Sequence, residues 1–174
     1  MYKDSKNKQK LLKDIVTDER FKVIDLGLRT EAKTAVFPGS KMSSNRKETL
    51  EIAGNLNKRN VSVYFLPESD TQKSADAIIK YKGKLIIVDL KYSNSTSNNT
   101  LYGDLKDGFG KSQMVVLKLR NADAGILAKT IDELARKEQI TGDLLLINRL
   151  GKEEIFRKRE LKNGKYLYRL HGFL

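Results

Sequence analysis

The sequence predicts an α/β (α+β) fold with a mixed central β-sheet flanked by helices. Three observations predict it: short apolar or alternating runs typical of strands, segments of helical period between them, and small polar clusters where these segments end. The expected order is helix, three strands, strand, helix, strand and a final hairpin. The 174 residues are expected to form a single domain, residues 1–174, because a chain of this length buries a substantial core.

The first third of the chain contains an arm, a helix and a strand. Residues 1–20 are rich in lysine and aspartate around the short run LLKDIV, so they are expected to form a basic arm that is mobile or docks late. Pro38-Gly39 and a Ser/Asn cluster lead into a helix over residues 46–58. The alternating run VSVYFLP, residues 61–67, predicts a strand.

The middle of the chain predicts two strands, residues 76–81 and 84–92, around a tight Lys-Gly turn. The polar run SNSTSNNT predicts a loop, and the segment LYGDLKDGFGKSQ predicts a helix interrupted by glycines. MVVLKL then predicts a buried strand.

The last third predicts a helix over residues 124–139, whose apolar residues have amphipathic spacing, and a strand at DLLLINR. The two alternating runs on either side of Asn163-Gly164 predict a β-hairpin.

Charge and composition narrow the classes of partner and metal. A formal net charge of +12 and a pI near 9.7 favour a polyanionic binding partner, with nucleic acid as the first candidate. A solvated lysine-rich surface or an acidic protein partner would explain the same surplus of positive charge. Cysteine is absent and His171 is the single histidine, so any metal site must use oxygen ligands. No apolar run approaches the roughly 20 residues that span a bilayer, so no membrane partner is expected.

Two acids, Asp76 and Asp89, lie within the predicted strands of the middle segment. A two-residue loop at Lys82-Gly83 would place them directly opposite each other, and a four-residue loop would keep that pairing, whereas a three-residue loop would turn Asp76 to the other face. Opposed carboxylates repel unless a cation such as Mg²⁺ or Mn²⁺ lies between them. The alternative is that Asp89 pairs with Lys91 or caps a strand end, and that Asp76 belongs to a turn that begins earlier.

Lys91 lies two residues after Asp89 and therefore on the same face of the strand. Two acids and an amine on one face are the parts of a metal-dependent phosphodiesterase. The chain contains five acid-x-Lys triplets, but only the one at Asp89 ends a strongly apolar strand that follows a second acid.

The order of KETLEIAGNL, FLPE, KSADAII, VDLKYS and KSQMVVLKL resembles the PD-(D/E)xK nuclease superfamily, with its restriction-endonuclease-like fold. More narrowly, residues 46–119 resemble the carboxy-terminal nuclease domains of contact-dependent growth inhibition (CdiA-type) and other polymorphic toxins. The resemblance implies that Asp76 and Asp89 bind metal and that Lys91 is the catalytic lysine. Ala75 stands in place of the motif's proline, and the acid of the second motif is Asp rather than Glu.

The resemblance also assigns two residues outside the hairpin. Glu48 matches a helix acid that completes the metal site, and Gln113 matches a polar residue beside the active site, with Lys111 a weaker candidate. Alternatively, Glu48 is a solvated acid of the first helical turn, and Gln113 ends a helix on a backbone partner.

The function implied is a Mg²⁺- or Mn²⁺-dependent endonuclease that cuts tRNA or other RNA, or else DNA. Such a bacterial toxin acts in the cytoplasm, is delivered as part of a longer secreted protein, and is held inactive by an acidic cognate immunity protein. The alternatives are a non-catalytic nucleic-acid-binding module with the same fold and an effector that binds an acidic protein.

Overall fold

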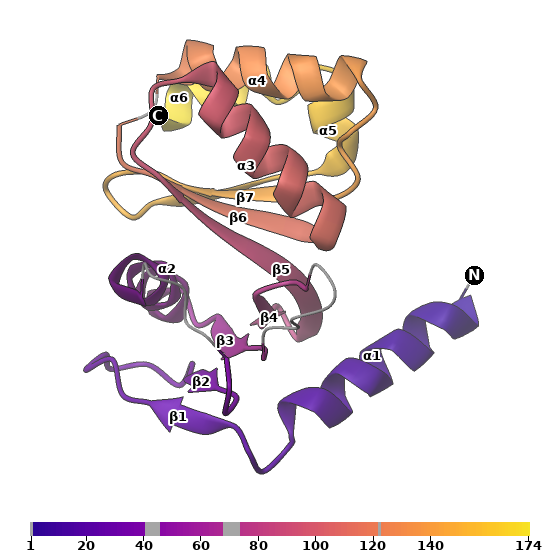
Figure 1. The fold of residues 1–174 in the computed structure, drawn as a ribbon, viewed down its shortest axis with the longest axis vertical. Coiled ribbons are helices and arrows are strands. Elements are labelled where there is room, and N and C mark those ends of the chain that lie inside the picture. The colour runs from indigo at the N-terminus through magenta and orange to yellow at the C-terminus, as the bar shows by residue number, and fades with distance from the viewer. Residues whose placement is uncertain (1, 41–45, 68–73, 122) are drawn as a thin grey trace. The chain divides into compact units, whose positions relative to one another are not determined.

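The computed structural model describes residues 2–40, 46–67, 74–121 and 123–174. The chain divides into two compact units, Met1–Ile87 and Val88–Leu174, and the boundary falls inside one long strand (Figure 1). That the two units together form one domain stays a prediction. The predicted fold class is confirmed, because each unit holds a mixed sheet with helices packed against it.

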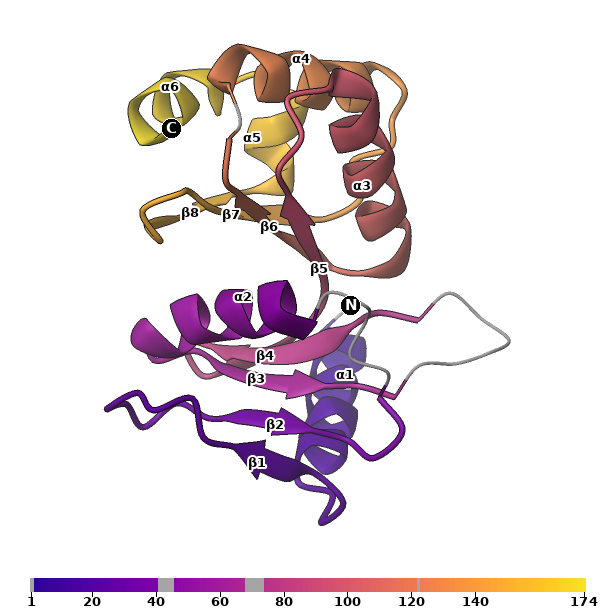
Figure 2. The same cartoon turned by 60° about the vertical axis from the view of Figure 1, so that its left-hand side comes forward.

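The first unit has a sheet of short strands in the order β1-β2-β3-β4-β5. Adjacent pairs alternate in direction: β1 and β2 are antiparallel, β2 and β3 parallel, and β3 and β4 antiparallel (Figure 2). Its elements are α1 (Tyr2–Val16), β1 (Lys22–Ile24), β2 (Thr34–Val36), α2 (Arg46–Lys58), β3 (Ser62–Phe65), β4 (Ala77–Tyr81) and the start of β5 (Lys84–Ser93).

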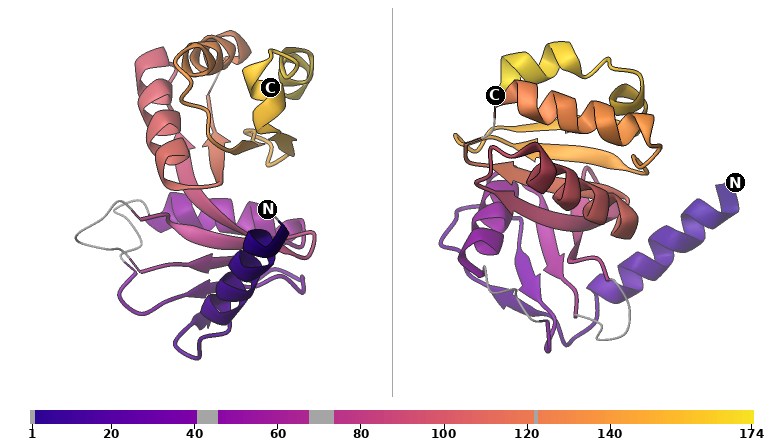
Figure 3. Two further views of the ribbon diagram at one scale, coloured as in Figure 1. Left: turned by 90° about the vertical axis from the view of Figure 1, so that its right-hand side faces the viewer. Right: turned by 45° about the horizontal axis from the view of Figure 1, so that its top comes forward.

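Helices α1 and α2 cover opposite faces of this sheet (Figure 3). Tyr64 and Ile78 are paired in register and pack with Leu12 of α1. On the other face, Thr34 Oγ1 donates a hydrogen bond of 2.8 Å to Asn57 Oδ1 of α2. The alternation of side chains along each strand therefore divides the unit into an α1 side and an α2 side.

The turn between β4 and β5 is the two-residue loop Lys82-Gly83, with φ of 47° and 76° at these two residues. Positive φ at both central residues is the signature of a type I′ hairpin turn. The two-residue loop considered from sequence is thus confirmed, although lysine is an uncommon first residue for this turn.

Helix α1 is held on β5 by a side-chain amide. Gln9 Nε2 donates to the Leu85 carbonyl oxygen at 2.7 Å, and the Leu85 N–H donates to Gln9 Oε1 at 3.0 Å. Leu12 lies one turn further along and is 3% exposed. The basic arm expected over residues 1–20 therefore contains a helix that packs on the sheet, and the prediction of mobility is not tested by these contacts.

The second unit has longer strands and a larger core. Its sheet has the order β5-β6-β7-β8, in which the first two pairs are parallel and the last is antiparallel. Helices α3 to α6 lie over one face of this sheet (Figure 1), and the core fills the space between them. The elements are α3 (Asn98–Lys111), β6 (Met114–Leu119), α4 (Ala124–Arg136), β7 (Asp143–Ile147), β8 (Glu153–Phe156), α5 (Lys158–Lys162) and α6 (Leu167–Phe173).

The hairpin predicted around Asn163-Gly164 is wrong. The segment forms α5 and α6, and Gly164 makes the turn between them at a φ of 74°. Tyr166 is fully buried there, and its hydroxyl donates to the Ala128 carbonyl oxygen at 3.0 Å. Burial of Tyr166 and Leu170 against α4 outweighs the local hairpin signal, because tertiary packing overrides weak strand propensity.

Two smaller expectations are also corrected. Helix α3 is continuous through Gly103 and Gly108, and it begins at Asn98, inside the run that was expected to be a loop. Strands β1 and β2 were not predicted, since they are three residues long each. No helix in the described ranges is long and apolar enough to cross a membrane.

Candidate active site

Asp89 and Lys91 lie on β5 in the second unit, on one face of the strand as their spacing predicts. Lys91 Nζ lies 2.9 Å from Asp89 Oδ2. The Asp89 side chain is fully buried, whereas 19% of the Lys91 side chain is exposed. The pair therefore joins a carboxylate in the interior to an ammonium group that solvent can reach.

The Asp89 carboxylate lies between two apolar surfaces. Val115 is its partner in register on β6, and Gly108 of α3 approaches so closely that a Cβ added there would lie 3.1 Å from Asp89 Oδ2. The same Cβ would lie 2.8 Å from Val115 Cγ2. The absence of a side chain at Gly108 thus lets the helix pack over the acid.

Neither oxygen of Asp89 makes a hydrogen bond to any described residue. The nearest cation is the ammonium group of Lys91, whose Nζ lies 2.9 Å from Asp89 Oδ2 in an ion pair. Buried carboxylates normally have their lone pairs satisfied, and an unsatisfied one is destabilising unless a cation binds it. Asp89 therefore has the capacity to accept a further cation.

Lys91 is shared with a second acid. Its Nζ lies 3.0 Å from Asp107 Oδ2 on α3, and Lys111 Nζ lies 2.6 Å from the same oxygen. Burial disfavours the charged form of Lys91, but Asp89 and Asp107 outweigh it and raise the pKa of the ammonium group. Lys91 is thus held as a cation at neutral pH.

Asp107 and Asp104 differ in protonation behaviour although both lie on α3. Burial opposes ionisation of Asp107, yet hydrogen bonds from Lys111 and Lys91 hold its pKa well below its usual range. Burial raises the pKa of Asp104; the positive charge of Lys91 opposes that rise, and the negative charges of Asp107 and Asp89 add to it. Three carboxylates therefore interact with the single ammonium group of Lys91.

Asp104 and Asp107 were missed by sequence reasoning. The signal that could have found Asp107 is its helical spacing to Lys111, four residues further on, which predicts an ion pair on one helix face. It was hidden because the glycines of this segment predicted a broken helix.

The other predicted acids, Asp76 and Glu48, lie in the first unit. Asp76 immediately precedes β4, and its carbonyl oxygen accepts a hydrogen bond of 3.0 Å from the Leu66 N–H. Glu48 is half-buried in the first turn of α2. Their convergence with Asp89, which belongs to the second unit, stays a prediction.

Gln113 lies between α3 and β6, two residues before the Val115 that pairs with Asp89. Its side chain is exposed, and its carbonyl oxygen accepts a hydrogen bond from the Asp143 N–H at 3.1 Å. A role for its amide beside the active site stays a prediction.

Within the described residues, no group of three or more His, Asp or Glu side chains is arranged to hold a metal ion. Asp89 nevertheless suits a metal by its chemistry, since it offers two buried oxygen donors without hydrogen bonds. A complete set of ligands would require further oxygens beside those of Asp89.

Comparisons with known proteins give one structural similarity. No protein-family model matches the chain, and no curated protein matches it in sequence. The chain is similar to a solved structure described as a CdiA-CT/CdiI toxin and immunity complex from Burkholderia pseudomallei, with 17% identity and a TM-score of 0.46. The similarity covers 69% of this chain and 91% of that one. At these values it carries no argument about activity.

Proposed function

We propose that this protein is a metal-dependent endonuclease and that Asp89 and Lys91 carry the reaction. The observation that supports the proposal most directly is the buried Asp89 carboxylate, which lacks hydrogen bonds to described residues and faces the ammonium group of Lys91. If Asp89 served only in a structural ion pair, its buried carboxylate would lack the hydrogen bonds that usually compensate for burial of a charge. Binding of a divalent cation would supply that compensation.

Asp89 would hold Mg²⁺ or Mn²⁺, with Asp76 and Glu48 as the further ligands that the motif order implies. When bound, such an ion lowers the pKa of water and polarises the phosphate. Lys91 acts as a fixed positive charge beside the phosphodiester, because its raised pKa makes it a poor general base. Asp107 positions Lys91 by sharing its ammonium group.

The proposed substrate is RNA, with tRNA first and DNA second. The net charge of +12 suits a polyanion. From the motif order we propose that the chain is a bacterial toxin domain that acts in the cytoplasm after delivery as part of a longer secreted protein. An acidic immunity protein would bind such a surface by charge complementarity.

Cleavage assays with matched variants test the proposal. The purified protein is incubated with tRNA and with plasmid DNA in Mg²⁺, Mn²⁺ or EDTA. We expect cleavage that EDTA abolishes, and a loss of at least about a hundredfold in Asp89→Asn and Lys91→Met. Glu133→Gln is the matched control, since it breaks the exposed ion pair of Glu133 with Lys137 (2.8 Å) and should cleave normally.

Metal binding gives a second readout that does not depend on turnover. Titration calorimetry with Mn²⁺ should show binding by the wild type, weaker binding by Asp89→Asn and unchanged binding by Glu133→Gln. Circular dichroism establishes that each variant is folded. Cleavage by a folded Asp89→Asn variant at the wild-type rate would reject the proposal.

A nucleic-acid-binding module is the second candidate. The observation that favours it is the chain of ion pairs from Asp89 through Lys91 and Asp107 to Lys111, which neutralises most of these charges within the protein. Tight RNA binding without cleavage in either metal, and without Mn²⁺ binding, would support this candidate.

A further inference from the structure

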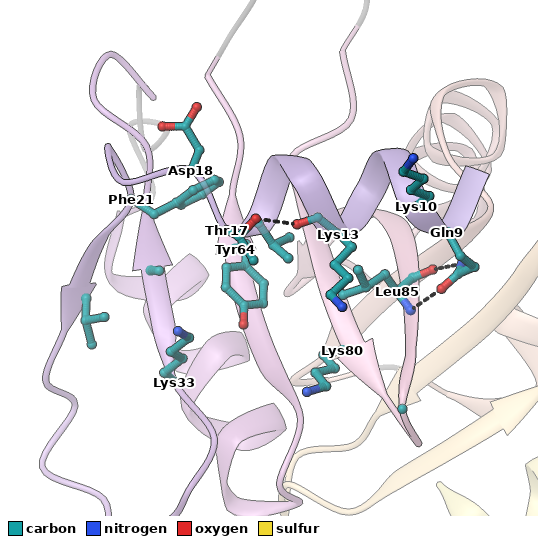
Figure 4. A pocket seen from close by; sticks show the side chains of 14 residues that line it. Gln9, Lys10, Lys13, Thr17, Asp18, Phe21, Lys33, Tyr64, Lys80 and Leu85 are labelled. Atoms are coloured by element: carbon teal, nitrogen blue, oxygen red, sulfur yellow. Dashed lines mark hydrogen bonds between the residues drawn. The ribbon is translucent and has the colours of Figure 1, made fainter. Parts of the chain in front are cut away.

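A cavity of about 810 Å³ lies between α1 and the sheet of the first unit (Figure 4). Its volume is within the range of small-molecule and cofactor sites. All its lining residues belong to the first unit, and neither Asp89 nor Lys91 is among them.

The walls of the cavity are held in place by specific contacts. Gln9 fixes α1 to the backbone of Leu85, and Phe21 packs edge-on against Tyr64 with ring centroids 5.8 Å apart. Val16, Ala35 and Leu85 complete a mainly apolar floor and wall. The cavity therefore has a stable, partly aromatic interior.

Four lysines line this apolar interior: Lys10 and Lys13 from α1, Lys33 from the segment before β2, and Lys80 from β4. In Figure 4 the side chains of Lys13, Lys33 and Lys80 are grouped around Tyr64. The Lys33 ammonium group lies 5.7 Å from the Tyr64 ring centroid. Their sequence positions are far apart, so only the folded sheet and helix bring them together.

These ammonium groups lack acidic partners among the residues that the structure describes. Asp18 is the acid among the lining residues, but Arg20 binds both of its oxygens, at 2.9 and 2.7 Å. Hydrogen bonds from Arg20 lower the pKa of Asp18 to about 2, so it remains a paired carboxylate. The cavity thus keeps a surplus of positive charge.

We infer that this cavity binds one nucleotide unit of a single-stranded nucleic acid, with phosphate on the lysines and base on the apolar floor. A fully apolar ligand would leave the lysine charges without a counterion. An acidic peptide would meet the lysines but has no flat ring for the interior beside Phe21 and Tyr64. Aromatic side chains with cations around them are the usual features of single-strand binding.

The inference takes nucleic acid as the ligand from the proposed function, but its test needs no cleavage. Binding of a short, fluorescent single-stranded RNA is measured by anisotropy in EDTA, in the Asp89→Asn background, over a series of salt concentrations. The pocket variant is Lys33→Gln/Lys80→Gln. The matched control is Lys58→Gln/Arg59→Gln, which removes the same charge from exposed positions at the end of α2.

The pocket variant should raise the Kd about tenfold and reduce the salt slope by about 0.7, the contribution of one phosphate contact on a single strand. The control should change neither by more than about twofold. Equal losses in both variants would show that only net charge matters and would overturn the inference.

Competition experiments test the base. A nucleoside monophosphate should displace the RNA at lower concentration than inorganic phosphate, and Phe21→Leu should reduce that difference. Displacement by polyglutamate as effectively as by RNA, or equal competition by the monophosphate and inorganic phosphate, would also overturn the inference.

Cleavage and binding separate the two proposals. A protein that cleaves RNA but binds normally with both pocket lysines replaced refutes only the cavity assignment. A protein that binds through Lys33 and Lys80 but never cleaves refutes only the nuclease assignment.

Discussion

The two units of this chain differ in whether their cationic side chains have acidic partners. In the second unit, Lys91 is paired with Asp89 and Asp107, and Arg169 is paired with Glu154 and Glu160. In the first unit, the lysines around Tyr64 have no acidic partner among described residues. The difference teaches that a net charge of +12 does not by itself locate a binding surface. A group of cations without acidic partners, beside an apolar cavity, is a better guide to the position of a binding surface.

The largest expected effect comes from removing one cation from each unit and comparing the stability of the two variants. Lys91→Met leaves the fully buried Asp89 without its counterion and should lower the free energy of unfolding by about 3–5 kcal/mol. Lys33→Met removes an exposed lysine and should change it by less than about 0.5 kcal/mol. Urea unfolding measures both.

A double variant sharpens the first result. Asp89→Leu/Lys91→Met removes both charges and should recover most of the stability lost in Lys91→Met, because the penalty arises from the unpaired acid. An equally unstable double variant would mean that Lys91 acts mainly through packing of its methylene groups.

A second test concerns the close approach of α3 to Asp89. Gly108→Ala should lower the free energy of unfolding by about 1–3 kcal/mol, since the new methyl group would lie 2.8 Å from Val115 Cγ2. Gly103→Ala in the same helix has no heavy atom within 4 Å of its added Cβ and should stabilise the protein by about 0.5–1 kcal/mol. Similar effects of the two changes would contradict the close packing over the acid.

The third test loosens the helix that forms a wall of the cavity. Gln9→Ala removes two hydrogen bonds to Leu85 and should lower the free energy of unfolding by about 1–2 kcal/mol. Asn7→Ala, at an exposed position of the same helix, should have almost no effect. Hydrogen exchange at the Leu85 amide should become faster in Gln9→Ala only.

The smallest expected effect is the pH dependence contributed by Asp107. Its pKa in the folded protein is below the ordinary 3.8, so its stabilising contribution is complete above that value and is lost as pH falls below it. Asp107→Asn should therefore be less stable than wild type at neutral pH, and the difference should shrink as pH falls below about 4. The effect is small because the side chain is 31% exposed and screened by solvent.

Asp18 of the first unit provides the comparison. Its pKa of about 2 also predicts a contribution that is lost between about pH 4 and 2, but Asp18 is paired with Arg20 alone, whereas Asp107 contacts both Lys91 and Lys111. At acid pH, the free energy of unfolding of Asp18→Asn should therefore stay close to that of the wild type. A larger effect for Asp18 than for Asp107 would contradict the ranking.

Local patterns predicted the elements whose signals lie within one segment. Helix α2 has the predicted bounds, Arg46–Lys58, and the turn at Lys82-Gly83 has the two-residue length that was weighed from sequence. The same-face placement of Asp89 and Lys91 followed from the period of a strand. Each of these depends on neighbours in sequence.

Features that depend on distant packing could not be predicted in this way. Tyr166 lies in a helical tail because it packs on α4, and Gly108 permits close contact of α3 with Val115 of β6 rather than breaking the helix. The lysines of the cavity come from α1, the segment before β2, and β4, so no local spacing brings Lys13, Lys33 and Lys80 together. The contact of Lys91 on β5 with Asp107 on α3 likewise joins residues of separate elements.

The amide of Gln9 has a consequence for how the chain behaves among other copies of itself. Leu85 lies on the part of β5 that precedes the pairing with β6, which begins at Val88. By occupying both the N–H and the C=O of Leu85, Gln9 takes the place that a strand from another molecule would use. Helix α1 thus protects an open strand edge from aggregation.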